Sequence, residues 1–481
     1  MLLSDILNNI SYIVTEGSLE KNIASLASDS AKVTKGGLFA AIVGTHVDGH
    51  TFIDSAIQNG ATVIVCEKMP ASPISGVTYV QVAHTPEALG FIADMFYGHP
   101  SQKLALVGVT GTNGKTTIAT VLYKLFESLG YKAGLFSTVE NRIHETVLPA
   151  TQTTPDLIVL HELLAKMVDE GITHCFMEVS SHAVDQNRIA GLHFTGGIFT
   201  NLTHDHLDYH KTFEAYFAAK KKFFDDLSET AFALTNKNDA YGEKILADTR
   251  AKKYTYGEIG YFSGKIVSMN INEMALSIEN ETTSFELVGK FNMYNILAIY
   301  GTAVLLGEEK KNVLAHLSKL QGATGRFHKM KAPNGSTVIV DYAHSPDALQ
   351  NVLETIRGII DTNGRIITVV GCGGDRDPSK RAPMGSIAAK LSDAAIFTAD
   401  NPRSEDPAVI ISSMGTSLTP DEMKKVATEP DRRKAIDMAV KMAQSNDVVL
   451  IAGKGHELYQ EIKGFKQPFS DFEVVEQAFR S

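Results

Sequence analysis

A lysine and two threonines end a glycine-rich turn near residue 114. The run from Gly108 to Thr117, GVTGTNGKTT, begins within the apolar segment LALVGVT and precedes a stretch with helical apolar spacing. Glycines let backbone N–H groups face an anion, a helix N-terminus adds positive potential, and Lys115 can reach the terminal phosphates. Thr116 can place its hydroxyl on Mg²⁺. The pattern therefore predicts an ATP-binding phosphate loop.

This loop departs from the usual nucleotide-binding pattern at one position. The usual pattern has a glycine five residues before Gly114, where this sequence has Val109, and the glycines here fall at 108, 111 and 114. The alternative is a tight structural turn without a ligand. The flanking segments favour the phosphate loop, because a strand before the turn and a helix after it are what a phosphate cradle requires.

Acidic and imidazole side chains follow two further apolar segments. Glu178 lies in the run MEVSSH, and the run THDHLDYH ends at His210. Magnesium takes hard oxygen ligands and keeps several waters, so one or two protein carboxylates suffice. Glu178 is therefore a candidate magnesium ligand. The histidines could instead bind zinc or only satisfy backbone groups in a turn, but neither a paired-cysteine motif nor His-Glu-x-x-His accompanies them.

Short β-branched runs alternate with helical patterns along the chain, which predicts an α/β fold with parallel sheets. The chain has 481 residues, enough for about three domains. We expect domains at residues 1–100, 101–325 and 326–481, with breaks at His99-Pro100-Ser101 and Gly325-Arg326. Residues 262–287 alternate polar and apolar side chains, which predicts antiparallel strands at a sheet edge.

Four strand candidates in the third region become polar at their carboxyl ends. They are STVIVDYAH, RIITVVGCGG, AAIFTADNPR and DVVLIAGKG. A helix with Leu349, Val352, Leu353 and Ile356 on one face is predicted between the first two. Ligands of open α/β sheets bind just outside the carboxyl ends of the strands. We therefore expect a second site in this region.

The overall composition excludes several classes of protein. The net charge of −10 argues against broad binding to nucleic acid or to anionic membranes. No apolar stretch approaches the roughly 18 residues that a membrane span needs, and the N-terminus does not resemble a signal peptide. Three widely spaced cysteines form no disulfide framework. We therefore expect a cytoplasmic protein.

Nine short motifs occur in the same order as in the Mur ligases of peptidoglycan synthesis, which this chain resembles. They are GTNGKTT from 111, TTPD from 153, MEVSSH from 177, DHLDYH from 205, FN at 291–292 with Asn295, DYAH from 341, GGDRD from 373, DNPR from 400 and GKGHE from 453. The most similar type uses ATP to add the third residue of the stem peptide to UDP-N-acetylmuramoyl-L-alanyl-D-glutamate. The resemblance implies an N-terminal domain for the UDP moiety, a central parallel-sheet domain like those of P-loop ATPases, and a Rossmann-like C-terminal domain for the amino acid.

The resemblance also implies roles for individual residues. The ATP site would comprise Gly111, Thr112, Asn113, Gly114, Lys115, Thr116, Thr117, Asn292, Asn295, Arg326, Asp341 and His344. Catalysis would use Lys115, Glu178, His206 and Lys220, with Mg²⁺ on Thr116, Glu178, His206 and Lys220. The nucleotide-sugar peptide would contact Ser30, Thr45, His46, Val47, Gln152, Thr153, Thr154, Ser180, Gln186 and Arg188. The first-domain matches among these are short, and ordinary turn residues are their alternative.

A lysine is carbamylated in this family, fourteen residues after the metal-binding histidine. By this correspondence, Lys220 follows His206. An ordinary lysine has a pKa of about 10.4 and would repel Mg²⁺ when charged. A carbamate would turn the same side chain into a long-armed carboxylate ligand. The alternative is that this lysine run is a solvated helix face.

Arginine and glutamate residues in the third region indicate which amino acid is added. Arg403, in DNPR, can clamp a carboxylate with two hydrogen bonds, Arg376 can supply a second clamp, and Glu457 can accept an ammonium group. The full predicted pocket comprises Arg376, Asp400, Asn401, Pro402, Arg403, Gly453 and Glu457. A ligand with two carboxylates and two amines fits, namely meso-diaminopimelate.

Taken together, these features predict a monomeric ligase that uses ATP and Mg²⁺ and passes through an acyl phosphate. L-Lysine is the alternative amino acid, although it would leave Arg403 without its partner. Another ligase with the same ATPase core, such as a folylpolyglutamate synthase, is disfavoured by the DNPR and GKGHE motifs. A non-catalytic nucleotide switch is disfavoured because it would need no second pocket for an amino acid.

Overall fold

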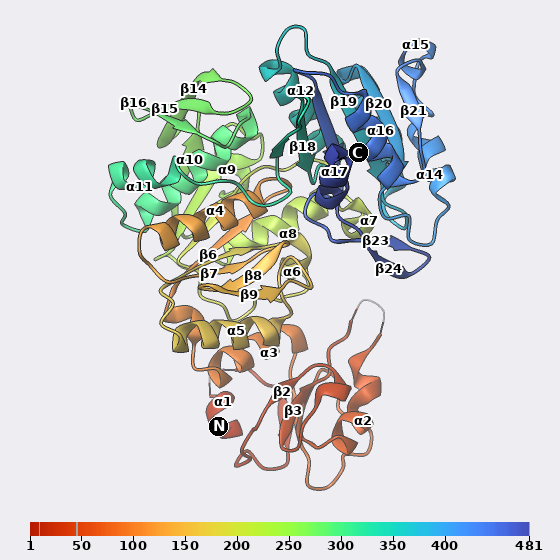
Figure 1. Cartoon of the computed structure of the whole chain (residues 1–481). Helices are drawn as coiled ribbons and strands as arrows, with labels where there is room; N and C mark the ends of the chain where they lie inside the picture. The colour runs from red at the N-terminus through yellow and green to blue at the C-terminus, as the bar shows by residue number, and fades with distance from the viewer. Residues whose placement is uncertain (9, 45–46, 481) are drawn as a thin grey trace.

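Three sheets follow one another along the chain (Figure 1). The structure is a computed structural model that describes residues 1–8, 10–44 and 47–480. In Figure 1 the N-terminal part lies at the bottom, the central part above it, and the C-terminal part at the upper right. The predicted three-domain α/β fold is confirmed. The boundaries at residues 100/101 and 325/326 stay a prediction.

The N-terminal sheet has the strand order β1-β5-β4-β3-β2. Its strands are β1 (Val14–Glu16), β2 (Leu26–Ala27), β3 (Gly37–Ala40), β4 (Ala61–Cys66) and β5 (Thr78–Gln81), and only β1 pairs antiparallel. The apolar runs of β3 and β4 are buried, as expected for parallel strands covered on both faces. The helical segments are α1 (Leu3–Ile6), η1 (Ser30–Lys32), η2 (Gly49–Phe52), α2 (Ile53–Gln58), α3 (Thr85–Phe96) and η3 (Pro100–Gln102).

The central sheet has eleven strands in the order β16-β15-β14-β13-β12-β11-β6-β10-β7-β8-β9. They are β6 (Ala105–Thr110), β7 (Ala133–Phe136), β8 (Glu140–Ile143), β9 (Thr146–Pro149), β10 (His174–Glu178), β11 (Gly196–Phe199), β12 (Phe232–Asn236), β13 (Lys252–Gly257), β14 (Phe262–Met269), β15 (Met274–Ile278) and β16 (Glu281–Phe285). The neighbouring strands β13, β12, β11, β6, β10 and β7 run parallel, whereas β8 and β9 pair antiparallel. The predicted antiparallel edge is confirmed, because β14, β15 and β16 pair antiparallel.

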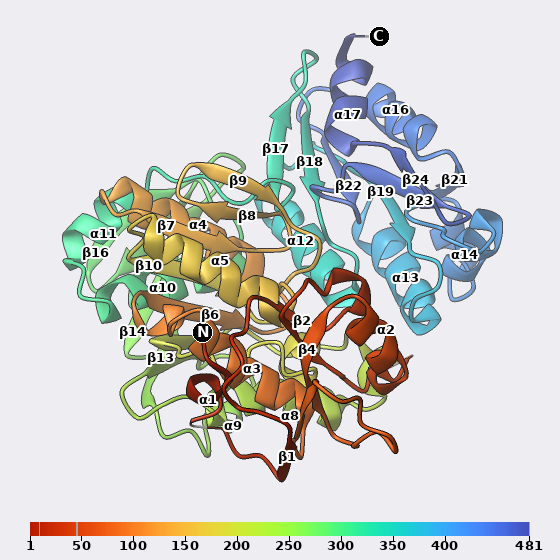
Figure 2. The same cartoon turned by 90° about the horizontal axis from the view of Figure 1, so that it is seen from below.

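Helices cover both faces of the central sheet (Figure 2). They are α4 (Lys115–Ser128), α5 (Leu157–Asp169), α6 (Ser181–Asp185), α7 (Leu207–His210), α8 (Phe213–Asp225), α9 (Gly242–Ile245), α10 (Lys290–Leu305) and α11 (Lys310–Leu317). The apolar stripe predicted after the phosphate loop lies on α4 and is fully buried, including Ile118, Leu122 and Phe126. Its burial fixes the start of α4 above the end of β6.

The C-terminal sheet has the order β17-β18-β22-β19-β20-β21, with a separate hairpin β23-β24. Its elements are β17 (His328–Lys331), β18 (Thr337–Asp341), α12 (Pro346–Ile359), β19 (Ile366–Cys372), η4 (Pro378–Lys380), α13 (Arg381–Leu391), β20 (Ala394–Ala399), α14 (Pro407–Met414), α15 (Pro420–Met423), β21 (Val426–Thr428), α16 (Arg432–Met442), β22 (Val448–Ala452), β23 (Tyr459–Ile462), β24 (Phe465–Pro468) and α17 (Asp471–Arg480). The four predicted strands are β18, β19, β20 and β22, and the predicted apolar face of α12 is buried.

The carboxyl ends of both large sheets carry the polar motifs. β6 leads into the phosphate loop and β10 ends at Glu178, while β18 ends at Asp341 and β20 precedes Asp400. The three cysteines are buried and unpaired. Within the described residues, no helix combines the length and apolar character that crossing a bilayer requires.

Candidate active site

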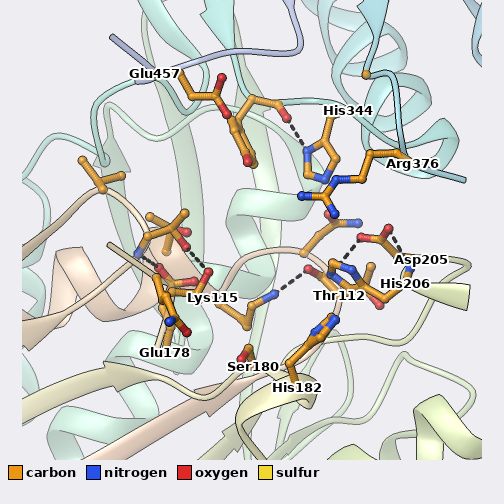
Figure 3. A pocket seen from close by; sticks show the side chains of 18 of the residues that line it. Thr112, Lys115, Glu178, Ser180, His182, Asp205, His206, His344, Arg376 and Glu457 are labelled. Atoms are coloured by element: carbon orange, nitrogen blue, oxygen red, sulfur yellow. Dashed lines mark hydrogen bonds and ion pairs between the residues drawn. The ribbon is translucent and has the colours of Figure 1, made fainter. Parts of the chain in front are cut away.

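A cavity of about 790 Å³ lies between the central and C-terminal sheets, lined by residues of both. Figure 3 shows Lys115, Glu178, Ser180 and His182 on one side, with His344, Arg376 and Glu457 on the other. Most of the predicted site residues line it: Thr112, Asn113, Gly114, Lys115, Thr116, Gln152, Thr153, Thr154, Glu178, Ser180, Arg188, His206, Lys220, Arg326, His344, Arg376, Asp400, Asn401, Arg403, Gly453 and Glu457. The predicted ATP site and the predicted amino-acid site therefore share one cavity.

The phosphate loop packs tightly where its glycines lie. Gly111 has φ +146°, and a side chain there would collide with the Thr200 hydroxyl. Gly114 has φ +91° and precedes the first turn of α4. The Lys115 ammonium bends back and donates to the carbonyl oxygens of Gly111 (2.9 Å) and Thr112 (2.8 Å). Burial lowers the pKa of Lys115, so an anionic ligand would stabilise its charged form.

Glu178 is completely buried at the end of β10. Its Oε1 accepts a hydrogen bond of 2.7 Å from the Thr138 backbone N–H, but its Oε2 has no partner among the described residues. A buried carboxylate oxygen without a partner is costly unless a ligand satisfies it. Within the part of the chain that the structure describes, no group of three or more His, Cys, Asp or Glu could hold a metal. This arrangement fits magnesium, which needs few protein ligands, better than a zinc cage.

Lys220 lies on α8 and is buried beneath the phosphate loop. Its Nζ donates to the Gly111 carbonyl oxygen (2.8 Å) and lies 4.6 Å from the centre of the Tyr216 ring. Burial lowers the pKa of Lys220 well below its usual value, and the nearby Lys115 lowers it further. The alternative of a solvated helix face is wrong for Lys220, although the neighbouring Lys222 is exposed.

His206 begins α7 in a left-handed conformation, with φ 55°. Its backbone N–H donates to Asp205 Oδ1 (2.9 Å), and its ring lies edge-on to that of His182, 5.0 Å between centres. Burial lowers the pKa of His206, opposed by the carboxylate of Asp205. Burial also lowers the pKa of His182 to about 4. Both imidazoles are therefore neutral near pH 7, and a neutral imidazole can bind a metal.

A smaller cavity of about 110 Å³ adjoins the phosphate loop. It brings together predicted ATP residues, namely Asn113, Gly114, Thr117, Asn292, Asn295, Arg326, Asp341 and His344, with apolar side chains such as Leu287 and Phe291. Asp341 accepts backbone hydrogen bonds from Phe327 (2.6 Å) and Ala343 (2.7 Å). Arg326 lies over the Tyr342 ring and donates to the Thr116 hydroxyl (3.0 Å). A flat apolar base would fit here beside the phosphate loop.

Polar side chains gather around Arg188 at the central-domain edge of the large cavity. The Arg188 guanidinium donates to the side-chain oxygens of Gln152 and Gln186 and to the backbone oxygen of Thr154. The Thr154 hydroxyl also donates to the Glu178 backbone oxygen (2.8 Å). Gln186 therefore supports Arg188 from outside the cavity. Through the hydrogen bond from Thr154, the predicted peptide-binding residues are connected to Glu178, beside the phosphate loop.

The predicted uridine residues lie elsewhere. Ser30 is in η1 and Val47 is exposed in the N-terminal part, and neither lines the two cavities described above. Thr45 and His46 lie outside the described residues. Gly111 and Pro402 also do not line these cavities. The contribution of the N-terminal domain stays a prediction.

The amino-acid side of the cavity is a network of charges. Arg403 has φ 51° and donates to the Gly374 backbone oxygen (2.7 Å), and its Nε lies 3.4 Å from a Glu461 carboxylate oxygen. The Asn401 amide donates to Glu457 Oε2 (2.8 Å). Arg376 is exposed and makes no hydrogen bond or ion pair with another residue in the described ranges. Carboxylates and guanidinium groups therefore face one space, as a zwitterionic ligand requires.

Three family models match consecutive parts of the chain. The Mur ligase middle domain matches residues 109–303, and the Mur ligase glutamate ligase domain matches residues 325–455. The model described as Mur ligase family, catalytic domain, matches residues 22–97. The chain belongs to the Mur ligase family.

Relatives of this Mur ligase match along almost its whole length. A protein of Cytophaga hutchinsonii named UDP-N-acetylmuramoyl-L-alanyl-D-glutamate–2,6-diaminopimelate ligase is 51% identical over 99% of both chains. A protein of Clostridium tetani with the same name is 40% identical, again over 99% of both. A solved structure of a ligase with this name has a TM-score of 0.70 at 29% identity and covers 100% of this chain and 99% of its own.

Several residues of this Mur ligase line the cavity but were not predicted as site residues from the sequence. Among them are Thr138, His182, Asp205, Tyr342, Asp377, Lys380, His456 and Tyr459. Five of these, including Asp205 and His456, stand inside the nine motifs shared with the Mur ligases, so the motifs could have identified them. Lys380 and Tyr459 lie just beyond a motif, and Thr138 lies outside them all.

Proposed function

We propose that this Mur ligase joins meso-2,6-diaminopimelate to UDP-N-acetylmuramoyl-L-alanyl-D-glutamate with ATP as co-substrate. One observation carries the proposal: a single cavity holds both the phosphate loop with Glu178 and the charged pocket around Arg403 and Glu457. A phosphoryl group can therefore be passed to a carboxylate within reach of an incoming amine. The names of the relatives at 40–51% identity supply the substrates.

The reaction would proceed in two steps within this cavity. The terminal carboxylate of the peptide attacks the γ-phosphorus of ATP, which forms an acyl phosphate and releases ADP. The amine of diaminopimelate then attacks the acyl carbon, which forms the amide and releases phosphate and a proton. Lys115 neutralises the transferring phosphoryl group, because phosphoryl transfer depends on positioning and charge more than on covalent chemistry.

No side chain needs to act as a nucleophile in these steps. The Ser180 hydroxyl accepts a hydrogen bond of 3.1 Å from the Ala183 N–H and so caps α6. The Ser181 hydroxyl is 2.9 Å from the His210 ring. Both serines are therefore engaged in structure and binding.

Thr116, Glu178, His206 and a modified Lys220 would hold Mg²⁺. The orphaned Oε2 of Glu178 supports this assignment. Bound Mg²⁺ would neutralise the phosphate charge that develops during transfer. The Arg326 guanidinium, which donates to the Thr116 hydroxyl here, would instead serve the phosphates directly.

The burial of Lys220 supports carbamylation. Because burial lowers its pKa well below the usual value, a larger fraction of its amine is neutral than in an exposed lysine, and a neutral amine attacks CO₂ to give a carbamate and a proton. The experiment is NMR with ¹³C-bicarbonate. The carbamate signal should appear in the wild type and in Lys222→Met, whose lysine is exposed. It should be absent from Lys220→Met, and a signal that survives in that variant would overturn the assignment.

Phosphate release in the presence of the UDP-dipeptide tests the amino acid. Release should depend on meso-diaminopimelate and be far slower with L-lysine, because L-lysine lacks the carboxylate that Arg403 and Arg376 would bind. Sites that hydrogen-bond a polar group reject analogues without it by roughly 10⁴-fold. A preference for lysine would overturn the choice of amino acid. ATP hydrolysis that needs neither substrate would favour a nucleotide switch.

The remaining assignments follow from this reaction. The cavity is completed by one chain, which supports a monomer, and the unpaired cysteines support a cytoplasmic setting. Residues 1–100 would hold the UDP moiety, residues 101–325 would bind ATP, and residues 326–481 would bind the amino acid.

A further inference from the structure

A completely buried lysine lies directly behind the amino-acid side of the cavity. Lys454 follows β22 and is 0% exposed, and it is not among the residues that line the cavity. Gly453 (φ 119°) and Gly455 (φ 54°) flank it, and a side chain at Gly453 would lie 2.9 Å from an Asp400 carboxylate oxygen. The two glycines therefore turn the lysine inward, against the pocket.

The Lys454 ammonium has three polar neighbours. It donates to Glu457 Oε2 (2.7 Å) and to Asn401 Oδ1 (3.0 Å), and it lies 3.6 Å from Asp400 Oδ1. Burying an ammonium group is costly unless it is paired and hydrogen-bonded. Here each neighbour belongs to a residue that lines the cavity. Lys454 does not line the cavity itself, so it can act on a ligand through these residues.

Lys454 also fixes the orientation of the Asn401 amide. Asn401 Oδ1 accepts from Lys454 and from the Glu461 backbone N–H (2.9 Å), so the oxygen must face these two donors. The amide nitrogen then faces Glu457 Oε2, which is also the oxygen that Lys454 binds. One ammonium thus holds both side chains in a single arrangement. Glu457 Oε1 stays available to the cavity, where Figure 3 shows the residue.

The charges at this end do not cancel. Within the cluster of Lys454, Asp400 and Glu457, two carboxylates face a single ammonium group, which leaves one negative charge. Arg432 also acts on both carboxylates, but its charge is paired with that of Asp471. We propose that Lys454 is a positioning residue for the incoming amino acid: it orients Asn401 and Glu457 and leaves the cluster of Lys454, Asp400 and Glu457 one net negative charge, which matches a single ammonium group. The distal amine of diaminopimelate would supply that group, so the inference rests on the proposed function.

Steady-state kinetics of Lys454→Met tests the proposal. The KM for diaminopimelate should rise about tenfold or more, the scale of a lost hydrogen bond to a charged group. The KM values for ATP and for the UDP-dipeptide should stay within about twofold, because Lys454 has no hydrogen bond to the phosphate loop. Lys454→Gln, uncharged but still a hydrogen-bond donor, should give an intermediate KM. Partial unfolding would lower the apparent kcat and leave each KM unchanged.

Two control variants separate positioning from stability. Ile451→Val removes a methyl group from the fully buried strand β22, which precedes Lys454, and should lower the Tm without changing the KM for diaminopimelate. Lys441→Met removes an exposed lysine of α16 and should change neither. An unchanged KM for diaminopimelate in Lys454→Met, or an equal rise in all three KM values, would overturn the role of Lys454 alone. A wild type without diaminopimelate-dependent phosphate release would overturn the proposed function instead.

Discussion

The phosphate loop and the amino-acid pocket bury their lysines in opposite ways. In the loop, Lys115 and Lys220 donate to backbone carbonyl oxygens, and both share the oxygen of Gly111. In the pocket, Lys454 donates to the side chains of Asn401 and Glu457. Burial lowers the pKa of both loop lysines. The ammonium groups at the loop therefore donate to no carboxylate, although Glu178 and Asp205 act on them electrostatically. The ammonium group of the pocket is hydrogen-bonded to the carboxylate of Glu457.

This difference separates a site whose buried cations have no carboxylate as a hydrogen-bond partner from one whose buried cation is already paired with a carboxylate. The loop lysines gain their counter-charge when phosphates or a carbamate arrive, so their burial costs stability in the free protein. The lysine of the pocket contributes to stability before any ligand binds. Removing a lysine at the loop should thus abolish the reaction. Removing the lysine of the pocket should lower the affinity for the amino acid and the stability of the fold.

The largest effect is expected for Lys115→Ala. Loss of this cation removes the group that neutralises the transferred phosphoryl, and kcat should fall by about 10³-fold. The measurement is phosphate release with all three substrates. Lys222→Ala, which changes an exposed lysine, is the control and should keep full activity. A Lys115→Ala enzyme near the wild-type rate would remove the phosphate loop from the mechanism.

Arg403→Lys should produce the next largest change, on the other side of the comparison. The lysine keeps the charge but cannot form two parallel hydrogen bonds to a carboxylate, so the KM for diaminopimelate should rise by about 10- to 100-fold. The KM for ATP should not change. Arg433→Lys, on the exposed face of α16, is the matched control. Equal KM values for wild type and Arg403→Lys would mean that Arg403 does not bind the substrate.

A smaller effect is expected where the two regions touch. Asp347, in the first turn of α12, accepts hydrogen bonds from the side chains of Asn113 (2.9 Å) and Thr203 (3.4 Å). This contact ties the C-terminal domain to the phosphate loop. Asp347→Ala should raise the KM for ATP by about 2- to 10-fold, the scale of one or two hydrogen bonds. Glu354→Ala changes an exposed residue of the same helix and should leave the KM for ATP unchanged. A similar rise in that KM for Glu354→Ala would mean that the Asp347 contact does not cause the effect.

The sequence predicted the fold best where apolar periodicity was strong. The stripe on α4 and the runs of β18, β19, β20 and β22 are buried as expected. β17, with the sequence HKMK, and β21, with only three residues, escaped prediction, because neither shows an apolar alternation. Both lie at the edges of the sheet, where pairing with a neighbour rather than burial defines the strand.

The residues of the candidate site likewise fall into those that the sequence predicted and those that it did not. Lys115 and Glu178 were found because each stands at the end of an apolar run. Lys454 also follows an apolar run, but its role depends on Asn401, which is 53 residues away, and the role of Asp347 depends on Asn113, which is 234 residues away. Only the folded chain shows that these groups meet.

The smallest effect, and the one that best distinguishes the two regions, is the change in thermal stability when a buried lysine is replaced. Burial lowers the pKa of Lys220, so the unfolded chain binds the proton more tightly than the folded one. The stability of the wild type in CO₂-free buffer should therefore rise with pH between the folded-state pKa and about 10.4. Lys220→Met lacks this penalty, and Lys115 still donates to Gly111.

Lys220→Met should consequently unfold a few degrees above the wild type at about pH 7, with a smaller difference at about pH 9. Lys454→Met should unfold below the wild type, because it leaves the carboxylates of Asp400 and Glu457 without their counter-ion. Thermal unfolding of both variants, with exposed Lys222→Met as the control, measures the contrast. Opposite signs for the two buried lysines would establish that one region buries its cations without a paired carboxylate and the other pairs its buried cation, whereas a lower Tm for both would contradict this distinction.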